Sequence, residues 1–247
     1  MISSDDLEDI RQALFDCSQN FDSAVLFPTV IPEAAPFVVS DPYAFAIATC
    51  LDRGTKADII WTIPYDIQQF LGHLDPRRIY QMSLDELADL FARLPRRPRY
   101  VNDAPRTLKE LTRIVVEECR GDASNIWKGK RASEVKRTFD SVYGVGEGIA
   151  NMALLLIEKA FSSHFSADDH RTMDIKPDGH TRRVLYRLGI SDSENEKNAI
   201  EAARRLNPDY PGEFDGILWL IGRTWCHPSN PDCQNCFMTK VCAKRID

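Results

Sequence analysis

Four of the seven cysteines lie within 17 residues of one another near the end of the 247-residue sequence, and this grouping constrains the fold more than any other feature. The pattern is Cys226-x6-Cys233-x2-Cys236-x5-Cys242. Thiolates that are spaced a few residues apart can wrap one metal centre if the compartment keeps them reduced. Four cysteine ligands suit zinc as well as an iron–sulfur cluster, so the ligand count leaves both open. The other three, Cys17, Cys50 and Cys119, stand singly on apolar faces and are predicted to be packed thiols.

The composition is that of a soluble globular protein, with 43% hydrophobic and 28% charged residues. The first residues are acidic, unlike a secretory signal, and the apolar run 152–157 is too short to span a bilayer. We therefore expect a cytoplasmic protein with no membrane partner. The net charge is −6, but residues 1–50 carry −7 of it and the remainder sums to +1. The acidic balance therefore leaves DNA binding open.

Helical periodicity dominates the sequence and no series of alternating strands is found, so the fold is predicted to be all-α. Two Ser-x-x-Glu capping boxes begin predicted helices, at Ser83 and at Ser193. Residues 21–40 are predicted to be an irregular connector, and residues 162–177 a polar loop. The predicted helices cover about 4–17, 43–51, 84–94, 104–119, 132–143, 147–161, 179–188, 193–206 and 211–226.

Tyr143-Gly144-Val145-Gly146 precedes the helix predicted from residue 147. Two glycines one residue apart permit a tight turn whose backbone N–H groups point outward, and a helix N-terminus directly after it is a ready anion site. An ordinary turn between two helices would have the same sequence. This motif therefore leaves both interpretations open.

Asp178 lies where a helix is predicted to begin, in Lys176-Pro-Asp-Gly-His180-Thr-Arg-Arg-Val184. One interpretation is an N-cap, a role worth about 1 kcal/mol. The other is a carboxylate at the mouth of a cleft, where it would stabilise a developing oxocarbenium ion at a sugar's anomeric carbon or orient an attacking water.

Taken together, these elements resemble the endonuclease III superfamily of helix–hairpin–helix (HhH-GPD) DNA glycosylases. The cysteine spacing is similar to the C-terminal [4Fe–4S] loop of that superfamily. The glycine turn resembles its L-P-G-V-G-x-K-T-A hairpin, and the segment at Asp178 resembles V-D-T-H-x-x-R-V. A fourth segment, residues 41–56, resembles N-P-F…L-S-A-Q-A-T, so the resemblance spans about residues 40–245. It implies a [4Fe–4S] cluster on the four cysteines and a catalytic role for Asp178.

The resemblance also implies two helical lobes, one formed by residues 41–163 and one by residues 1–40 and 164–247, with the cluster loop at 226–242. The expected partner of this monomer is double-stranded DNA with a damaged or mismatched base, which is flipped into a pocket. A monovalent cation is expected at the hairpin. The expected DNA-binding residues are Gly144, Gly146, Gly148, Arg53 and His180. The candidate pocket residues are Asp52, Tyr143 and Ile149, and Asp52, Arg53 or Lys56 would fill the gap in the duplex.

Gly148 departs from the superfamily pattern, because bifunctional members carry there the lysine that attacks the sugar. No side chain at this position can form a Schiff base. The primary hypothesis is therefore a monofunctional DNA glycosylase, which hydrolyses the N-glycosidic bond without lyase activity. One alternative is a non-catalytic DNA-binding or lesion-recognition protein, which Gly148 and the acidic balance favour. The other is a bifunctional glycosylase/AP lyase that uses a different lysine, such as Lys176. The sequence does not identify the base removed.

Overall fold

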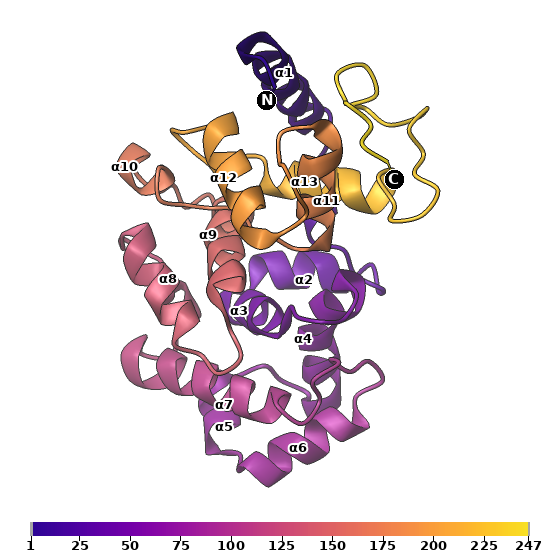
Figure 1. The fold of residues 1–247 in the computed structure, drawn as a ribbon. Coiled ribbons are helices and arrows are strands. Elements are labelled where there is room, and N and C mark those ends of the chain that lie inside the picture. Colours follow the sequence, from indigo (N-terminus) through magenta and orange to yellow (C-terminus); the bar gives the residue numbers. More distant parts are fainter. Residues whose placement is uncertain (1, 247) are drawn as a thin grey trace. The chain divides into compact units, whose positions relative to one another are not determined.

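The computed structural model describes residues 2–246, and within that range it consists of helices joined by loops, without β-strands (Figure 1). The predicted all-α fold is confirmed. The chain divides into two compact units. The central unit is Phe27–His164, and the terminal unit combines the residues up to Leu26 with those from Phe165 onward.

The central unit holds eight α-helices and two short irregular helices in its described residues. These are α2 (Ala34–Ser40), α3 (Pro42–Leu51), α4 (Ala57–Leu71), α5 (Pro76–Gln81), α6 (Leu84–Arg93), α7 (Ala104–Arg113), η2 (Ile114–Glu118), η3 (Ala123–Ile126), α8 (Ala132–Asp140) and α9 (Glu147–Phe161). The terminal unit holds α1 (Ser4–Gln19), η1 (Ser23–Leu26), α10 (Ala167–His170), α11 (Gly179–Leu188), α12 (Glu196–Leu206) and α13 (Asp215–Thr224).

Helix α3 is the buried centre of the central unit. Asp41 caps it, because its Oδ1 accepts hydrogen bonds from the amides of Tyr43 and Ala44 at 2.8 and 3.1 Å, and Pro42 occupies the first turn. Every residue from Tyr43 to Leu51 is buried, and α2, α4, α7 and α9 pack around them. Aromatic rings fill the core beside α3, with Phe45 lying 5.7 Å from Trp61 between ring centroids. A helix that is apolar on all sides is stable in water only when it is enclosed in this way.

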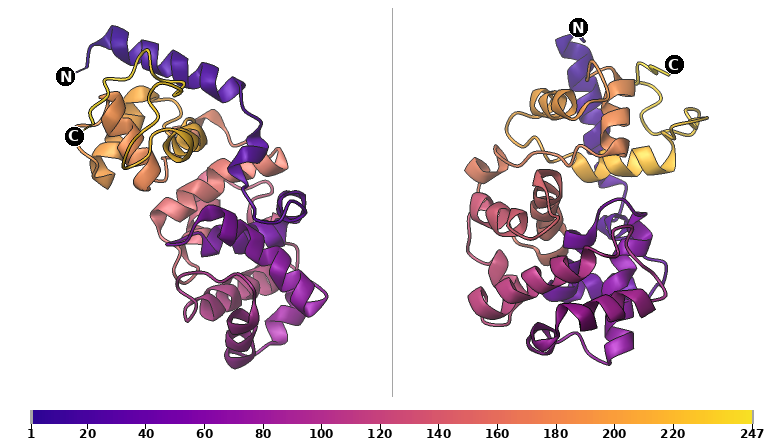
Figure 2. Two further views of the ribbon diagram at one scale, coloured as in Figure 1. Left: turned by 90° about the vertical axis from the view of Figure 1, so that its right-hand side faces the viewer. Right: turned by 60° about the horizontal axis from the view of Figure 1, so that its bottom comes forward.

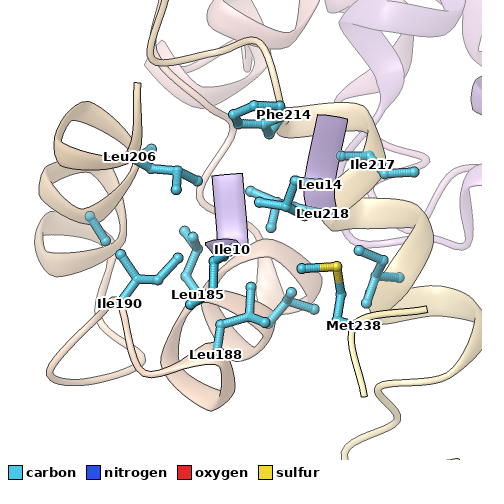
Figure 3. Close-up of a cluster of buried hydrophobic side chains, with 14 of the residues drawn as sticks. Ile10, Leu14, Leu185, Leu188, Ile190, Leu206, Phe214, Ile217, Leu218 and Met238 are labelled. Atoms are coloured by element: carbon cyan, nitrogen blue, oxygen red, sulfur yellow. The ribbon is translucent and has the colours of Figure 1, made fainter. Parts of the chain in front are cut away.

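The core of the terminal unit joins the two ends of the chain (Figure 3). Ile10 and Leu14 of α1 enter a cluster built by α11, α12 and α13, and α1 lies along α12 and α13 (Figure 2). Met238, from the segment between the third and fourth grouped cysteines, packs into the same cluster. The cysteine segment is therefore attached to this core through an apolar contact as well as through its covalent connection to α13.

The structure differs from the sequence predictions in several segments. Residues 21–40, predicted to be an irregular connector, contain η1 and α2, and α2 packs on α3 and α4. For this reason residues 27–40, which the sequence placed with the N-terminal helix, lie in the central unit. The predicted polar loop 162–177 contains the single-turn helix α10. Helices α4 and α5 correspond to no predicted element, because a proline lies inside α4 and α5 is only six residues long.

Of the two helix caps predicted from the local sequence, one is confirmed and one is wrong. The capping box of Ser83 and Glu86 is confirmed, with both reciprocal hydrogen bonds present. The predicted cap at Ser193 is wrong, since α12 begins two residues later and Asn195 accepts the capping bond from the amide of Asn198 at 2.8 Å. The last long helix begins at Asp215, after turns from residue 211, and not at 211.

Among the described residues, no single helix has the length and apolar character needed to cross a membrane. One pair, α2 with α3, meets those criteria when taken together, with a bend of 107° between the two helices.

The packing of α1 generates the first prediction. Leu14 is fully buried, and its neighbour Phe15 is 44% exposed. We expect Leu14→Ala to lower the free energy of unfolding by about 2–5 kcal/mol, because it leaves a cavity between the two ends of the chain. Phe15→Ala is the matched control and is expected to change it by no more than about 0.5 kcal/mol. Urea unfolding followed by circular dichroism measures both, and equal effects would contradict the role assigned to α1.

Candidate functional site

The turn between α8 and α9 has the backbone of a tight hairpin. Gly144 has a φ of 81°, in the left-handed region that glycine adopts without strain, and the amide of Val145 donates to the carbonyl of Val142 at 3.0 Å. Gly146 is the N-cap of α9 and no side chain makes a capping bond there. The positive end of the helix dipole is therefore presented at the turn, as an anion site requires.

Arg53 holds this turn from the end of α3. Its Nη1 donates to the carbonyl of Gly144 at 2.9 Å, and Nη2 lies 3.4 Å from Oγ1 of Thr107 and 3.9 Å from Oδ2 of Asp103. The guanidinium also lies 5.2 Å from the ring centroid of Tyr100. Thr107 in turn donates to the carbonyl of Tyr143 at 2.9 Å. To fill a gap in a duplex, the Arg53 side chain would have to leave all of these partners.

The three candidate pocket residues differ in the surface that they offer. Tyr143 is half-buried, its amide donates to Oε2 of Glu110 at 2.7 Å, and the guanidinium of Arg106 stacks 3.9 Å from its ring centroid. Ile149 and Asp52 are only 8% and 9% exposed. Tyr143 is thus the most exposed of the three candidate pocket residues, and it directly precedes Gly144 of the hairpin.

Gly148 lies in the first turn of α9, two residues after the N-cap, and is partly exposed. The residue before it, Glu147, pairs with a lysine of α8, since Nζ of Lys136 contacts Oε1 of Glu147 at 2.7 Å. Position 148, being a glycine, has no side chain that could act as a nucleophile.

Asp178 is the N-cap of α11 in the terminal unit. Its Oδ1 accepts hydrogen bonds from the amides of His180 and Thr181 at 2.7 and 3.0 Å, and the hydroxyl of Thr181 lies 3.0 Å from the same oxygen. The two amides at the start of α11 hold the carboxyl group in a fixed position. Oδ2 has no hydrogen-bond partner among the described residues, and Asp178 is only half-buried. The residue therefore caps the helix and still offers one oxygen to a ligand.

His180 packs tightly against α13. A Cβ added to Gly222 would lie 2.7 Å from Cβ of His180, so only glycine fits at this crossing. The ring of His180 contacts Trp219 edge-on at 6.2 Å between centroids, and its Nδ1 lies 3.2 Å from Nη2 of Arg183. These contacts fix the position of the imidazole, and its role toward DNA stays a prediction.

Arg183 is buried and connects α11 to the end of α13. Its guanidinium donates to the carbonyl oxygens of Gly179 at 2.7 Å, Gly222 at 2.9 Å and Cys226 at 2.6 Å. Three accepting carbonyls satisfy the buried charge. The helix that begins at Asp178 is therefore bonded to the residue where the cysteine segment starts.

Asp215, the first residue of α13, is a site residue that the sequence analysis missed. It is 8% exposed, and its Oδ1 accepts a hydrogen bond from the amide of Lys176 at 2.7 Å. Burial and then the negative charge of Asp178 raise the pKa of its carboxyl to about 7, while the amide bond and the charge of Lys176 act in the opposite direction. In the sequence it is an ordinary acid in the first turn of a helix, and no local signal marks it.

The four grouped cysteines all line one pocket, together with apolar residues that include Val184, Ile221 and Trp225. Arg187 approaches Sγ of Cys226 at 3.6 Å, and the amide of Lys244 donates to Sγ of Cys242 at 3.4 Å. Donors of this kind stabilise thiolates that bind a metal. The other three cysteines are buried singly, as predicted for packed thiols.

The donor set at this pocket fits a group held by four thiolates. Burial raises the pKa of the Cys236 and Cys242 thiols, and hydrogen bonds from backbone amides oppose that effect. A bound metal would supply the positive charge that favours the thiolate form. Within residues 2–246, no three histidine, cysteine or acidic side chains are arranged to hold a single metal ion.

The chain is similar in sequence to two characterised proteins, although no family model matches it. It is 25% identical over 204 residues to endonuclease III of Thermotoga maritima, which covers 82% of this chain and 83% of that protein. It is 26% identical over 137 residues to adenine DNA glycosylase of Arabidopsis thaliana, which covers 49% of this chain and 22% of the plant protein.

Solved structures show the same fold. The chain matches an endonuclease III trapped as a covalent intermediate with DNA, with a TM-score of 0.65, 18% identity and coverage of 99% of this chain and 97% of the other. It also matches a thermostable thymine-DNA glycosylase with a TM-score of 0.57, 23% identity and coverage of 83% and 84%. The chain therefore has the endonuclease III-like helix–hairpin–helix glycosylase fold.

The contact between Arg53 and the hairpin generates the second prediction. A Cβ at Gly144 would meet Nη1 of Arg53 at 1.9 Å, so Gly144→Ala must displace the guanidinium and also strain a residue with positive φ. We expect a loss of about 2–4 kcal/mol in the free energy of unfolding, from a left-handed residue and a lost charged hydrogen bond.

Two comparisons in urea unfolding isolate the cause. Gly146→Ala has no atom within 4 Å of the added Cβ and is expected to cost less than about 1 kcal/mol. In an Arg53→Ala background, the cost of Gly144→Ala is expected to fall to the backbone contribution of roughly 1–2 kcal/mol. An undiminished cost in that background would show that Arg53 does not hold the turn.

Proposed function

We propose that this protein is a DNA glycosylase, which flips a damaged or mismatched base out of double-stranded DNA and hydrolyses its N-glycosidic bond. The observation that carries the proposal is Asp178, whose Oδ1 is held by the first amides of α11 while Oδ2 has no hydrogen-bond partner within residues 2–246. The likeness to endonuclease III and to a thymine-DNA glycosylase supports the same class of reaction.

The proposed chemistry belongs to the carboxylate of Asp178. As the bond to the base breaks, positive charge develops on the sugar, and a fixed negative charge beside it lowers the energy of that state. The same oxygen is suited to orient the water that attacks the anomeric carbon. Gly148 removes the nucleophile that would lead to strand cleavage, which supports a monofunctional enzyme.

The hairpin is proposed to hold the DNA backbone. The turn at Gly144–Gly146 and the uncapped start of α9 present amide groups and the helix dipole to a phosphate, with a monovalent cation at the turn. Contacts of this kind position DNA without reading its sequence. Tyr143, stacked under Arg106, is the proposed wall for the flipped base, since its ring is half-buried beside the turn.

The four cysteines that line one pocket are proposed to hold a [4Fe–4S] cluster. When bound, the cluster would connect the four cysteines of the C-terminal segment to one another. Arg187 would donate to Cys226, and it also holds the carbonyls of His227 and Pro228 at 2.6 and 3.0 Å. These contacts give the loop its shape, so the role of the group here is structural.

A non-catalytic lesion-recognition protein is the second candidate function, and Gly148 is the observation that favours it. Such a protein would bind damaged DNA through the hairpin and leave the base in place. A bifunctional enzyme that uses Lys176 stays an alternative for the assay to exclude, since the bond from the backbone amide of Lys176 to Asp215 does not involve the ammonium group.

Asp178→Asn tests the proposed chemistry. Asparagine caps helices as well as aspartate does, so the fold is retained while the negative charge is lost. On a panel of duplexes with damaged or mismatched bases, we expect the wild type to release at least one base and the variant to be slower by about a hundredfold or more.

In the same assay the strand should break only after treatment with alkali, as a monofunctional enzyme requires. A break without alkali would favour a lyase. Binding without release across the whole panel would favour the lesion-recognition protein. Undiminished release by Asp178→Asn would exclude this residue as the catalytic group.

Cys236→Ser tests the cluster. Protein purified without oxygen is expected to contain iron and acid-labile sulfide, with the broad visible absorption of an iron–sulfur group, and the variant is expected to lose both. Cys119→Ala is the matched control, because Cys119 is buried away from the grouped cysteines, and it should keep the iron. Stoichiometric zinc in place of iron would contradict the assignment.

A further inference from the structure

Asp215 is bonded to the segment 176–178, which carries the proposed catalytic carboxylate of Asp178. Helix α13 packs closely on α11, and its first side chain reaches the amide of Lys176, two residues before Asp178, at 2.7 Å. The carbonyl of Lys176 then accepts from the amide of Asp178 at 2.8 Å and from the hydroxyl of Thr181 at 2.7 Å. Asp215 is thus the buried support of the turn that places Asp178 at the start of α11.

The carboxyl group of Asp215 also interacts with the charge of Asp178. It is 8% exposed, and burial together with the negative charge of Asp178 raises its pKa to about 7. Lys176 acts in the opposite direction, because both the hydrogen bond from its backbone amide and the positive charge of its ammonium group favour the ionised form of Asp215. Two carboxyl groups that repel each other resist being ionised together, so the buried one keeps its proton to a higher pH than an exposed aspartate does.

We propose that Asp215 is a positioning residue for Asp178: its buried carboxyl group holds the 176–178 turn, and its neutral form places no second negative charge beside Asp178. Ionisation of Asp215 repels the Asp178 carboxylate, shifts it from the position that the turn gives it, and so slows base release. This inference rests on the proposed glycosylase function. A merely structural acid at the start of α13 would be exposed and would favour the ionised form at the helix dipole, whereas Asp215 is enclosed and bonded to the turn that precedes Asp178.

Asp215→Asn imitates the neutral state. The amide oxygen still accepts the bond from Lys176, and the side chain can no longer ionise. Asp215→Ala removes both the bond and the charge. Asp174→Asn is the control, because Asp174 is also a buried acid of the terminal unit but its two oxygens bind Arg204 at 2.8 and 2.7 Å and not the 176–178 turn.

The first measurement needs no substrate. Because the pKa of Asp215 is raised in the folded state, the folded protein binds a proton that the unfolded chain has already lost above about pH 4. The stability of the wild type therefore falls between about pH 4 and pH 7, and Asp215→Asn lacks this loss. We expect the melting temperature of Asp215→Asn minus that of the wild type to be larger at pH 8 than at pH 5. In an Asp178→Asn background this difference between the two pH values should shrink.

The second measurement is single-turnover base release between pH 5.5 and 9. The wild-type rate should fall above about pH 7, by up to about tenfold per pH unit, as one ionisation allows. Asp215→Asn should keep its rate on the alkaline side, and Asp215→Ala should be slow throughout because the turn loses its support. Asp174→Asn should retain the wild-type pH profile.

The outcomes separate the two proposals. Base release with the same pH profile in wild type and Asp215→Asn overturns the positioning role while the glycosylase function stands. A melting difference that does not change with pH overturns the raised proton affinity of Asp215. If the wild type releases no base, the proposed function fails, and a melting difference that depends on pH and on Asp178 still establishes that the two carboxyl groups are coupled.

Discussion

The close crossing of α11 and α13 is the constraint on which the terminal unit depends. It requires a residue without a side chain at Gly222, and the buried Arg183 crosses the junction to donate to the carbonyl of Gly222 and to that of Cys226. Asp178 begins one of the two helices and Asp215 begins the other. The relative position of the two carboxyl groups and the starting point of the cysteine segment are therefore set by one helix contact, and a change that separates the helices would affect all three.

The hairpin of the central unit is held in place by side-chain hydrogen-bond donors that bind the carbonyl groups of the turn. Thr107 binds the carbonyl of Tyr143, and Arg53 binds that of Gly144. These two carbonyl groups are bonded to side chains of the protein. The N–H groups in the first turn of α9, where no side chain makes a capping bond, are therefore the polar groups of the turn that could bind an anion. Gly144, with its positive φ, lies between these contacts and the start of α9, and its carbonyl points toward Arg53.

What could be predicted from the sequence was whatever depends on residues close together in the chain. The capping box at Ser83, the cap of α11 by Asp178 and the gathering of four cysteines at one pocket all follow from local spacing. Asp215 could not be predicted, because its burial and its charged neighbour come from a segment 39 residues away. Arg53 is similar: the sequence suggests a side chain that reaches DNA, and only the tertiary structure shows that it is bonded 91 residues away.

The terminal unit is assembled from the two ends of the chain, and this has a consequence for the order of synthesis. Helix α1 leaves the ribosome long before its packing partners do, because the cluster that encloses Ile10 and Leu14 is built by residues from Ile175 to Met238. The central unit, made wholly of intervening residues, is complete before its neighbour can close. Until α11, α12 and α13 have emerged, the apolar face of α1 has no partner in this cluster, and Met238 completes the cluster only when most of the cysteine segment has been made.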